Sequence, residues 1–226
     1  MVTKQESLRV ALSAAGVRRL LLHPAAKPLV FVLCLLPFVW LTLGAASDRL
    51  GANPAEVLIR SLGDWALRFL CLTLAVTPLR VLTQTPQLVR FRRMLGLYVF
   101  FYASLHLLAY AWLDMGLDAS DIGRDILKRP FILMGLLAWL ALVPLAATSF
   151  NAAIRYLGSA RWQALHRLVY VAVCLALVHF LWMRAGKRNF GEVAVYAAIV
   201  GVLLIWRMQA AIGRRRQRFK VAASRP

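Results

Sequence analysis

Six long apolar segments alternate with short basic segments along the 226-residue chain. The apolar segments cover approximately residues 28–46, 55–77, 92–113, 131–149, 162–183 and 192–212. A helix needs about 20 residues to cross the roughly 30 Å hydrocarbon core of a bilayer, and each segment approaches that length. The segments lack the apolar–polar alternation of membrane-barrel strands, whereas helices satisfy their own backbone hydrogen bonds in lipid. The pattern predicts an all-α protein, a polytopic membrane helix bundle of six transmembrane helices.

Composition supports a membrane protein. The chain is 61% hydrophobic and 16% charged, whereas soluble proteins are about half apolar and about a quarter charged. The formal net charge of +19 lies mainly between the apolar segments and in the tails. Contact with anionic lipid explains that distribution, and no basic soluble module remains to bind nucleic acid. We predict a cytoplasmic tail at 1–27, one membrane domain at 28–212 and a basic tail at 213–226.

Lysines and arginines also predict the orientation of the helices. Most of those outside the apolar segments lie in the two tails and in the second and fourth connections. The positive-inside rule therefore places both termini in the cytoplasm. The tail motif GRRRQRFK (213–220) is most simply an anchor to anionic lipid, and an acidic partner is the alternative. The longest external connection then carries four acidic residues: Asp114, Asp118, Asp121 and Asp125.

Several familiar features are missing from the sequence. No small-residue cleavage site follows the first apolar segment, so we expect that segment to remain as a helix. The three cysteines lie inside apolar segments without a CxxC pair, which favours buried thiols over disulfides or a metal site. They are Cys34, Cys71 and Cys174. No internal repeat is visible.

Three of the four histidines lie in apolar segments. At about 1.5 Å of rise per residue, His106 lies roughly 21 Å above the inner end of the third segment, His179 roughly 25 Å above that of the fifth, and His166 about 6 Å. His106 and His179 therefore share a level near the outer face. Two neutral imidazoles facing each other across a bundle are the usual axial ligands of a low-spin b-type haem. We predict that His106 and His179 bind haem iron.

Other roles for the histidines stay open at this point. A single histidine in a membrane helix can hydrogen-bond its neighbour and do nothing else. His166 lies about 220° around a straight helix from His179, so the two share a face only if the helix bends. His166 could ligate a second haem, contact a flavin or quinone, or satisfy polar groups. His23, beside Pro24, is expected at the interface and is the weaker candidate for a missing ligand.

The second segment carries three charged residues at four-residue spacing, Arg60, Asp64 and Arg68, which share one helix face. An aspartate with an arginine one turn away on each side offsets most of the cost of burial, which favours a salt-bridged stripe. Alternatively, Arg60 near the outer end could bind a haem propionate. Arg68 or Asp64 could serve a quinone or proton path.

Several motifs resemble a known family. They are LAVTPLR (74–80), RRMLGLYVFFYASLHLLAY (92–110), LAATS (145–149), YLGSARWQALHRLVY (156–170) and VHFLW (178–182). Together they resemble MsrQ proteins, the haem-binding membrane subunits of bacterial periplasmic methionine sulfoxide reductase systems, within the ferric-reductase-like transmembrane family. The resemblance covers roughly residues 29–210. In that family the histidines matching His106, His166 and His179 are the expected haem ligands.

The resemblance implies an electron-transfer subunit of the bacterial inner membrane. Such proteins take electrons from the quinone pool or a cytosolic flavin reductase and pass them through b haem, one or two, and FMN. The acceptor is a periplasmic, molybdopterin-containing, MsrP-like subunit that reduces methionine sulfoxide in oxidised proteins. We assign no catalytic residue to this chain, because it lacks a constellation for sulfoxide chemistry. Because only about fourteen residues follow the sixth apolar segment, we expect no FAD- or NADPH-binding domain after it.

Two other functions remain as alternatives. A transmembrane ferric or cupric reductase would discharge electrons to metal ions outside, and the four aspartates of the external connection could attract such cations. A small transporter could use the charged stripe of the second segment to line its pathway.

Overall fold

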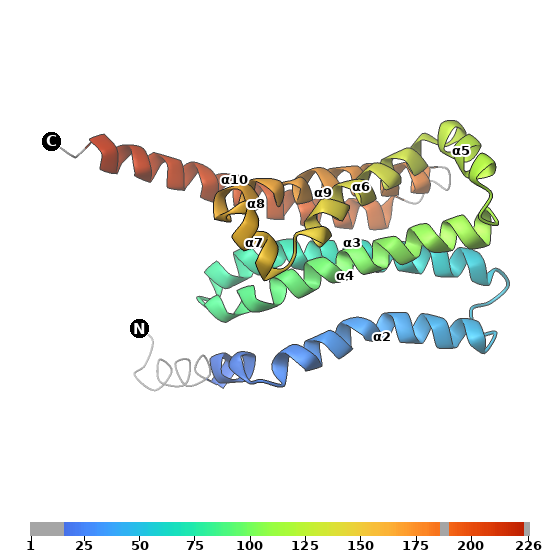
Figure 1. Cartoon of the computed structure of the whole chain (residues 1–226), viewed down its shortest axis with the longest axis horizontal. Coiled ribbons are helices and arrows are strands. Elements are labelled where there is room, and N and C mark those ends of the chain that lie inside the picture. Colours follow the sequence, from blue (N-terminus) through green and yellow to red (C-terminus); the bar gives the residue numbers. More distant parts are fainter. Residues whose placement is uncertain (1–15, 186–189, 224–226) are drawn as a thin grey trace. The chain divides into compact units, whose positions relative to one another are not determined.

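The computed structural model describes residues 16–185 and 190–223, and its regular elements there are helices (Figure 1). Six helical stretches are long and apolar enough to cross a membrane. They are Ala26–Ala46, Pro54–Leu82, Pro86–Asp114, Pro130–Ala147, Ser159–Ala185 and Gly191–Gly213. The predictions of an all-α fold and of six spans are confirmed, and the chain is a multi-pass membrane protein.

Large apolar side chains cover much of the outside of these helices. Trp40 is 67% exposed and Val202 is also 67% exposed. In water such a surface would be costly, at roughly 25 cal/mol per Å² of apolar area. Lipid contact removes that cost, so these exposed residues agree with membrane-spanning helices.

The chain forms two compact units, and the first ends at Asp114. Its described elements are a short helix at 16–22, α2 (Ala26–Ala46), α3 (Pro54–Leu82), η1 (Pro86–Leu88), α4 (Val89–Ala109) and η2 (Tyr110–Asp114). α3 packs along α4, and α2 contacts both. Asn53 caps α3 by accepting the Glu56 N–H at 3.1 Å, and Pro54 occupies the first turn, where a missing N–H is tolerated.

A tyrosine holds α2 against α4 in this unit. Tyr102 is fully buried, and its hydroxyl accepts the Phe38 N–H at 3.1 Å while donating to Cys34 O at 2.8 Å. These are the donor and acceptor that one turn of α-helix would join. Pro37, which lacks an N–H, lies inside α2 beside this point. The hydroxyl therefore serves backbone groups at a proline-weakened turn.

The second unit begins at Met115. Its elements are α5 (Ala119–Lys128), α6 (Pro130–Ala147), α7 (Asn151–Leu157), α8 (Ser159–Leu165), α9 (Leu168–Ala185) and α10 (Gly191–Ala223). α6 packs along α9, α10 contacts α9, and α5 contacts α6. The indole N–H of Trp162 donates to Thr148 O at 2.9 Å, which ties α8 to the end of α6.

Some helix boundaries differ from the sequence prediction. α3 continues to Leu82, beyond the predicted end at 77, and the third span begins at Pro86, before the predicted start at 92. Pro78 lies inside α3 and is buried there. A proline removes one backbone hydrogen bond, and the packing of α3 along α4 keeps the helix intact. The connection between the third and fourth spans contains a helix that the sequence analysis did not predict, α5.

Two of the three cysteines are buried as predicted. Cys34 and Cys71 lie in the core, but Cys174 is exposed, so the prediction of a buried thiol was wrong for Cys174. Its neighbours Ala172 and Val173 are buried, and Cys174 lies on a different face of α9. An apolar segment in a membrane can be apolar on every side, so its sequence does not show which face packs against protein.

The domain boundaries at 1–27, 28–212 and 213–226 stay a prediction. Residues 1–15, 186–189 and 224–226 lie outside the described part of the chain. Within GRRRQRFK, the side chains of 214, 215 and 218–220 also lie outside it.

Candidate functional site

His106 lies on α4 and faces α3. Its Nδ1 is 2.8 Å from Ile59 O, and the side chain is half-buried. A carbonyl oxygen can only accept a hydrogen bond, so Nδ1 carries the proton. In the neutral ring Nε2 then has the lone pair, which is the arrangement of a metal-binding histidine oriented by a carbonyl.

A glycine lies directly against this imidazole. A Cβ placed on Gly63 would lie 3.1 Å from Nδ1 and 3.2 Å from Cε1 of His106. Gly63 is four residues after Ile59 on α3, so it is one turn from the carbonyl that accepts the hydrogen bond. The missing side chain at Gly63 allows the ring to approach α3 closely.

His179 has the same surroundings in the second unit. It lies half-buried on α9 against α6, with Nδ1 2.6 Å from Phe131 O. A Cβ on Gly135 would lie 2.9 Å from Nδ1 and 3.0 Å from Cε1 of His179. Gly135 follows Phe131 by four residues. Each unit therefore holds one histidine in the Nδ1-protonated form against a glycine of a neighbouring helix.

The sequence shows no internal repeat, yet this local arrangement occurs in both units. The elements are the pairs α3–α4 and α6–α9. The sequence analysis identified both histidines but neither of these glycines. The available signal was a glycine inside an otherwise apolar membrane segment, which commonly marks a close approach between helices.

His166 has a different setting. It follows the last residue of α8, its Nδ1 is 3.0 Å from Trp162 O of its own helix, and its ring stacks on Trp162 with centroids 3.8 Å apart. Its Nε2 is buried. The sequence analysis left open whether the fifth span bends, and the structure shows an interruption of the helix at His166 and Arg167. The predicted 220° rotation between His166 and His179 therefore does not apply.

His23 is exposed before α2. Its Nδ1 accepts the Ala25 N–H at 3.2 Å, so a neutral His23 carries its proton on Nε2. This is the opposite tautomer to that of His106 and His179. The geometry favours a local turn-stabilising role for His23.

The charged stripe on α3 has partners that the spacing did not indicate. Arg60 is half-buried and forms an ion pair with Glu56, one turn earlier. Arg68 is exposed, and its guanidinium lies 4.7 Å from the centre of the Trp65 ring. An anionic group that binds the Arg60 guanidinium would compete with the Glu56 carboxylate for it.

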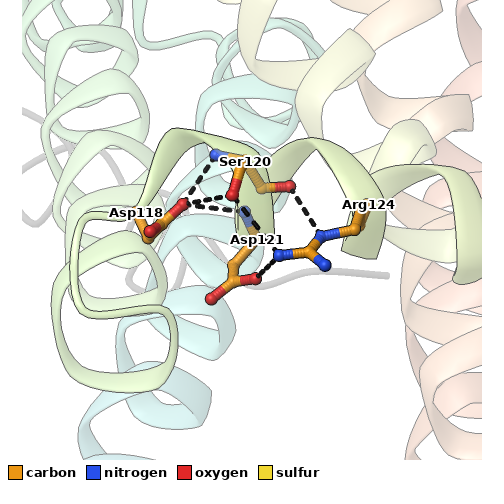
Figure 2. A network of polar contacts seen from close by, with 4 residues as sticks. All are labelled: Asp118, Ser120, Asp121 and Arg124. Atoms are coloured by element: carbon orange, nitrogen blue, oxygen red, sulfur yellow. Dashed lines mark hydrogen bonds and ion pairs between the residues drawn. The ribbon is translucent and has the colours of Figure 1, made fainter.

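The aspartates of the connection between the third and fourth spans largely interact with α5 and the residue after it. Asp118 caps the helix: its carboxylate accepts the Ser120 N–H at 2.8 Å, the Ser120 hydroxyl at 2.7 Å and the Asp121 N–H at 3.0 Å (Figure 2). Asp121 pairs with Arg124 at 2.5 Å, and Asp125 pairs with Arg129. Within the described residues, no group of three or more His, Cys, Asp and Glu side chains could hold a metal ion. Asp118, Asp121 and Asp125 therefore each have a partner in α5 or at its end.

Replacing Asp118 by alanine should speed amide hydrogen exchange in the first turn of α5, because the cap would be lost. The hydrogen bond from the Ser120 hydroxyl, followed by those from the Asp121 and Ser120 N–H groups, lowers the pKa of Asp118. The cap's contribution is thus present above the unfolded pKa of about 3.9 and is lost as the pH falls through the lower folded value. Asp118→Asn, an equally good cap, should keep slow exchange. Unchanged exchange in Asp118→Ala would contradict the capping role.

Comparison with known proteins decides the family. Residues 62–177 match the family model described as "Ferric reductase like transmembrane component". A protein-methionine-sulfoxide reductase heme-binding subunit MsrQ from Polaromonas naphthalenivorans is 66% identical over 86% of this chain and 89% of that protein. The chain belongs to the MsrQ family. Two further MsrQ proteins support this assignment. The protein from Ralstonia nicotianae is 52% identical over 81% of this chain and 87% of that protein. The protein from Rhodospirillum rubrum is 48% identical over 83% of this chain and 89% of that protein.

Membership in the MsrQ family covers both units of the structure. The stretch matched by the family model begins within α3 and ends within α9, so it includes most of both helix pairs that position the histidines. Gly63, His106, Gly135 and His166 lie inside it, and His179 follows two residues after its end. The resemblance drawn from the sequence motifs is confirmed.

Proposed function

We propose that this MsrQ-family chain binds b-type haem and is the membrane electron-transfer subunit of a methionine sulfoxide reductase system. The observation that carries the proposal is the shared state of His106 and His179. Each donates Nδ1–H to a backbone carbonyl of a neighbouring membrane helix, at 2.8 Å and 2.6 Å. Each ring is thereby held in the tautomer and orientation that suit coordination through Nε2.

In this proposal the imidazoles of His106 and His179 would hold the haem iron. When bound, a haem with two imidazole ligands supplies a one-electron carrier without an open position for substrate. His166 is the candidate ligand of a second haem, and its stacking on Trp162 fixes the plane of its ring. Arg60 is the candidate partner of a propionate, in competition with Glu56. FMN stays a prediction from the family resemblance.

We place both termini in the cytoplasm and the chain in the bacterial inner membrane. In the first unit, Arg18 donates to Gln84 O at 3.3 Å and Arg90 donates to Leu21 O at 2.5 Å. The basic N-terminal segment and the basic second connection therefore lie at the same end of that unit, in agreement with the positive-inside rule. Electrons would enter from the quinone pool or a cytosolic flavin reductase and leave toward a periplasmic molybdopterin-containing subunit.

The test begins with the purified protein in detergent. We expect a Soret band and low-spin b-type spectra in a redox titration, with haem and flavin quantified per chain. Reduced protein in right-side-out vesicles should be reoxidised by methionine sulfoxide only when the periplasmic subunit is added outside. Inverted vesicles are the matched control for orientation. A colourless preparation would refute haem binding, and equally fast reoxidation by Fe(III) alone would favour a ferric reductase.

A further inference from the structure

We propose that Gly63 and Gly135 are positioning residues that control the electronic state of the two haem-ligating histidines. Each glycine opens a path from an imidazole Nδ1–H to a backbone carbonyl on the neighbouring helix. This inference rests on the proposed function, because it assigns the residues that hold the ligands in their coordinating form.

The accepting carbonyls occupy equivalent positions. In an α-helix the carbonyl of residue i points toward residue i+4, whose side chain stands beside it. Ile59 O points toward Gly63, and Phe131 O points toward Gly135. Glycine leaves the side of each carbonyl accessible, so the oxygen can accept a lateral hydrogen bond from a ring on another helix.

A methyl group at either glycine would be closer to the imidazole than an ordinary contact allows, and the contact would be tighter at Gly135 than at Gly63. Nonbonded heavy atoms are in optimal contact at about 3.5–4.0 Å. A Cβ would lie 3.1 Å from His106 Nδ1 at Gly63 and 2.9 Å from His179 Nδ1 at Gly135. Since each ring is attached to its own packed helix, relief of this contact requires the ring to move away. Such a movement lengthens or breaks the hydrogen bond to the carbonyl.

The other described glycines of the membrane helices do not face an imidazole: a Cβ on Gly44 would lie 2.8 Å from Leu50 Cδ2, the end of a flexible side chain. A Cβ on Gly96, in the same helix as His106, would lie 3.8 Å from Thr73 Cγ2, an ordinary contact. A Cβ on Gly201 in α10 would have nothing within 4 Å. The close contact with an imidazole therefore distinguishes Gly63 and Gly135, and it recurs once in each unit.

The hydrogen bond matters for the electronic properties of the ligand. Donation from Nδ1 makes Nε2 more basic and fixes the direction of its lone pair. A more basic ligand stabilises ferric over ferrous iron. Weakening either hydrogen bond should therefore raise the haem midpoint potential and weaken haem retention. Loss of a partner of this kind typically costs about 10–100-fold in metal affinity.

The first experiment compares Gly63→Ala and Gly135→Ala with the controls Gly96→Ala and Gly201→Ala. All four gain the same methyl group in a helix, so the intrinsic preference of alanine for helix is matched. Redox titration and the EPR signal of the oxidised haem are the readouts. We expect an upward potential shift or weakened haem retention in the first pair and wild-type behaviour in the controls. Unchanged potential, EPR signal and retention in the first pair would overturn the proposal.

A second experiment needs no haem. Thermal stability of the apoprotein is measured for Gly63→Ala with His106 present and with His106→Ala, and likewise for Gly135→Ala with His179. We expect each glycine change to destabilise beside the imidazole and to stabilise once the ring is removed. Equal effects in both backgrounds would overturn the positioning role even if haem binds. If each glycine change destabilises only when its histidine is present, but the wild-type protein is colourless, the contact is confirmed and only the proposed haem function is refuted.

Discussion

Replacement of either His106 or His179 by alanine is expected to abolish most of the bound haem and its low-spin spectrum. In the proposed site each change would remove an iron–nitrogen bond, and each imidazole is held by a backbone carbonyl, at 2.8 Å and 2.6 Å. No neighbouring side chain is expected to replace it, because an axial ligand must present its donor atom in a fixed direction. Haem per chain, measured as the pyridine haemochrome of detergent-purified protein, provides the readout.

His23→Ala is the matched control for these variants. His23 is exposed and accepts a hydrogen bond at Nδ1, so its loss should leave the haem content unchanged. His166→Ala tests the second haem: half the wild-type content would indicate two haems, and full content would leave only one. Retention of full haem in both His106→Ala and His179→Ala would rule out the ligand assignment.

The helices were predictable from the sequence because the membrane sets their length. An apolar helix of about 20 residues crosses a hydrocarbon core of about 30 Å and satisfies its own backbone hydrogen bonds, so six apolar segments of that length are expected to be helices. The helix ends were less predictable: Pro78 stays inside α3 because tertiary packing outweighs one missing hydrogen bond. The interruption at His166 was also hidden, since an apolar pattern continues through it.

The candidate ligands could be identified from residue type and depth, but their supporting atoms could not. The sequence does not show which backbone carbonyls accept a hydrogen bond from a side chain, as Ile59 O and Phe131 O do. Gly63 and Gly135 are visible in the sequence, although a glycine can occur in a membrane helix for several reasons. The structure makes their role specific, because it places each within contact distance of an imidazole.

The second large effect is expected at the buried tyrosine of the first unit. Tyr102→Phe should lower the free energy of unfolding by about 1–3 kcal/mol, the usual cost of leaving a buried polar group without its hydrogen bond. The hydroxyl contacts both Phe38 N–H and Cys34 O. Pro37 already removes one backbone donor from this turn of α2. Loss of the hydroxyl should therefore weaken the packing of α2 against α4.

Tyr156→Phe provides the control, because it makes the same chemical change at a side chain that is 91% exposed. Thermal unfolding in detergent and amide exchange of residues 31–42 would measure the effect, and exchange should rise in α2 more than in α3. The aromatic ring of Phe keeps the stacking with Phe69, whose centroid lies 5.2 Å from that of Tyr102, so a loss would report the hydroxyl and not the ring. Equal stability of Tyr102→Phe and Tyr156→Phe would show that the α2 turn satisfies its own backbone groups despite Pro37.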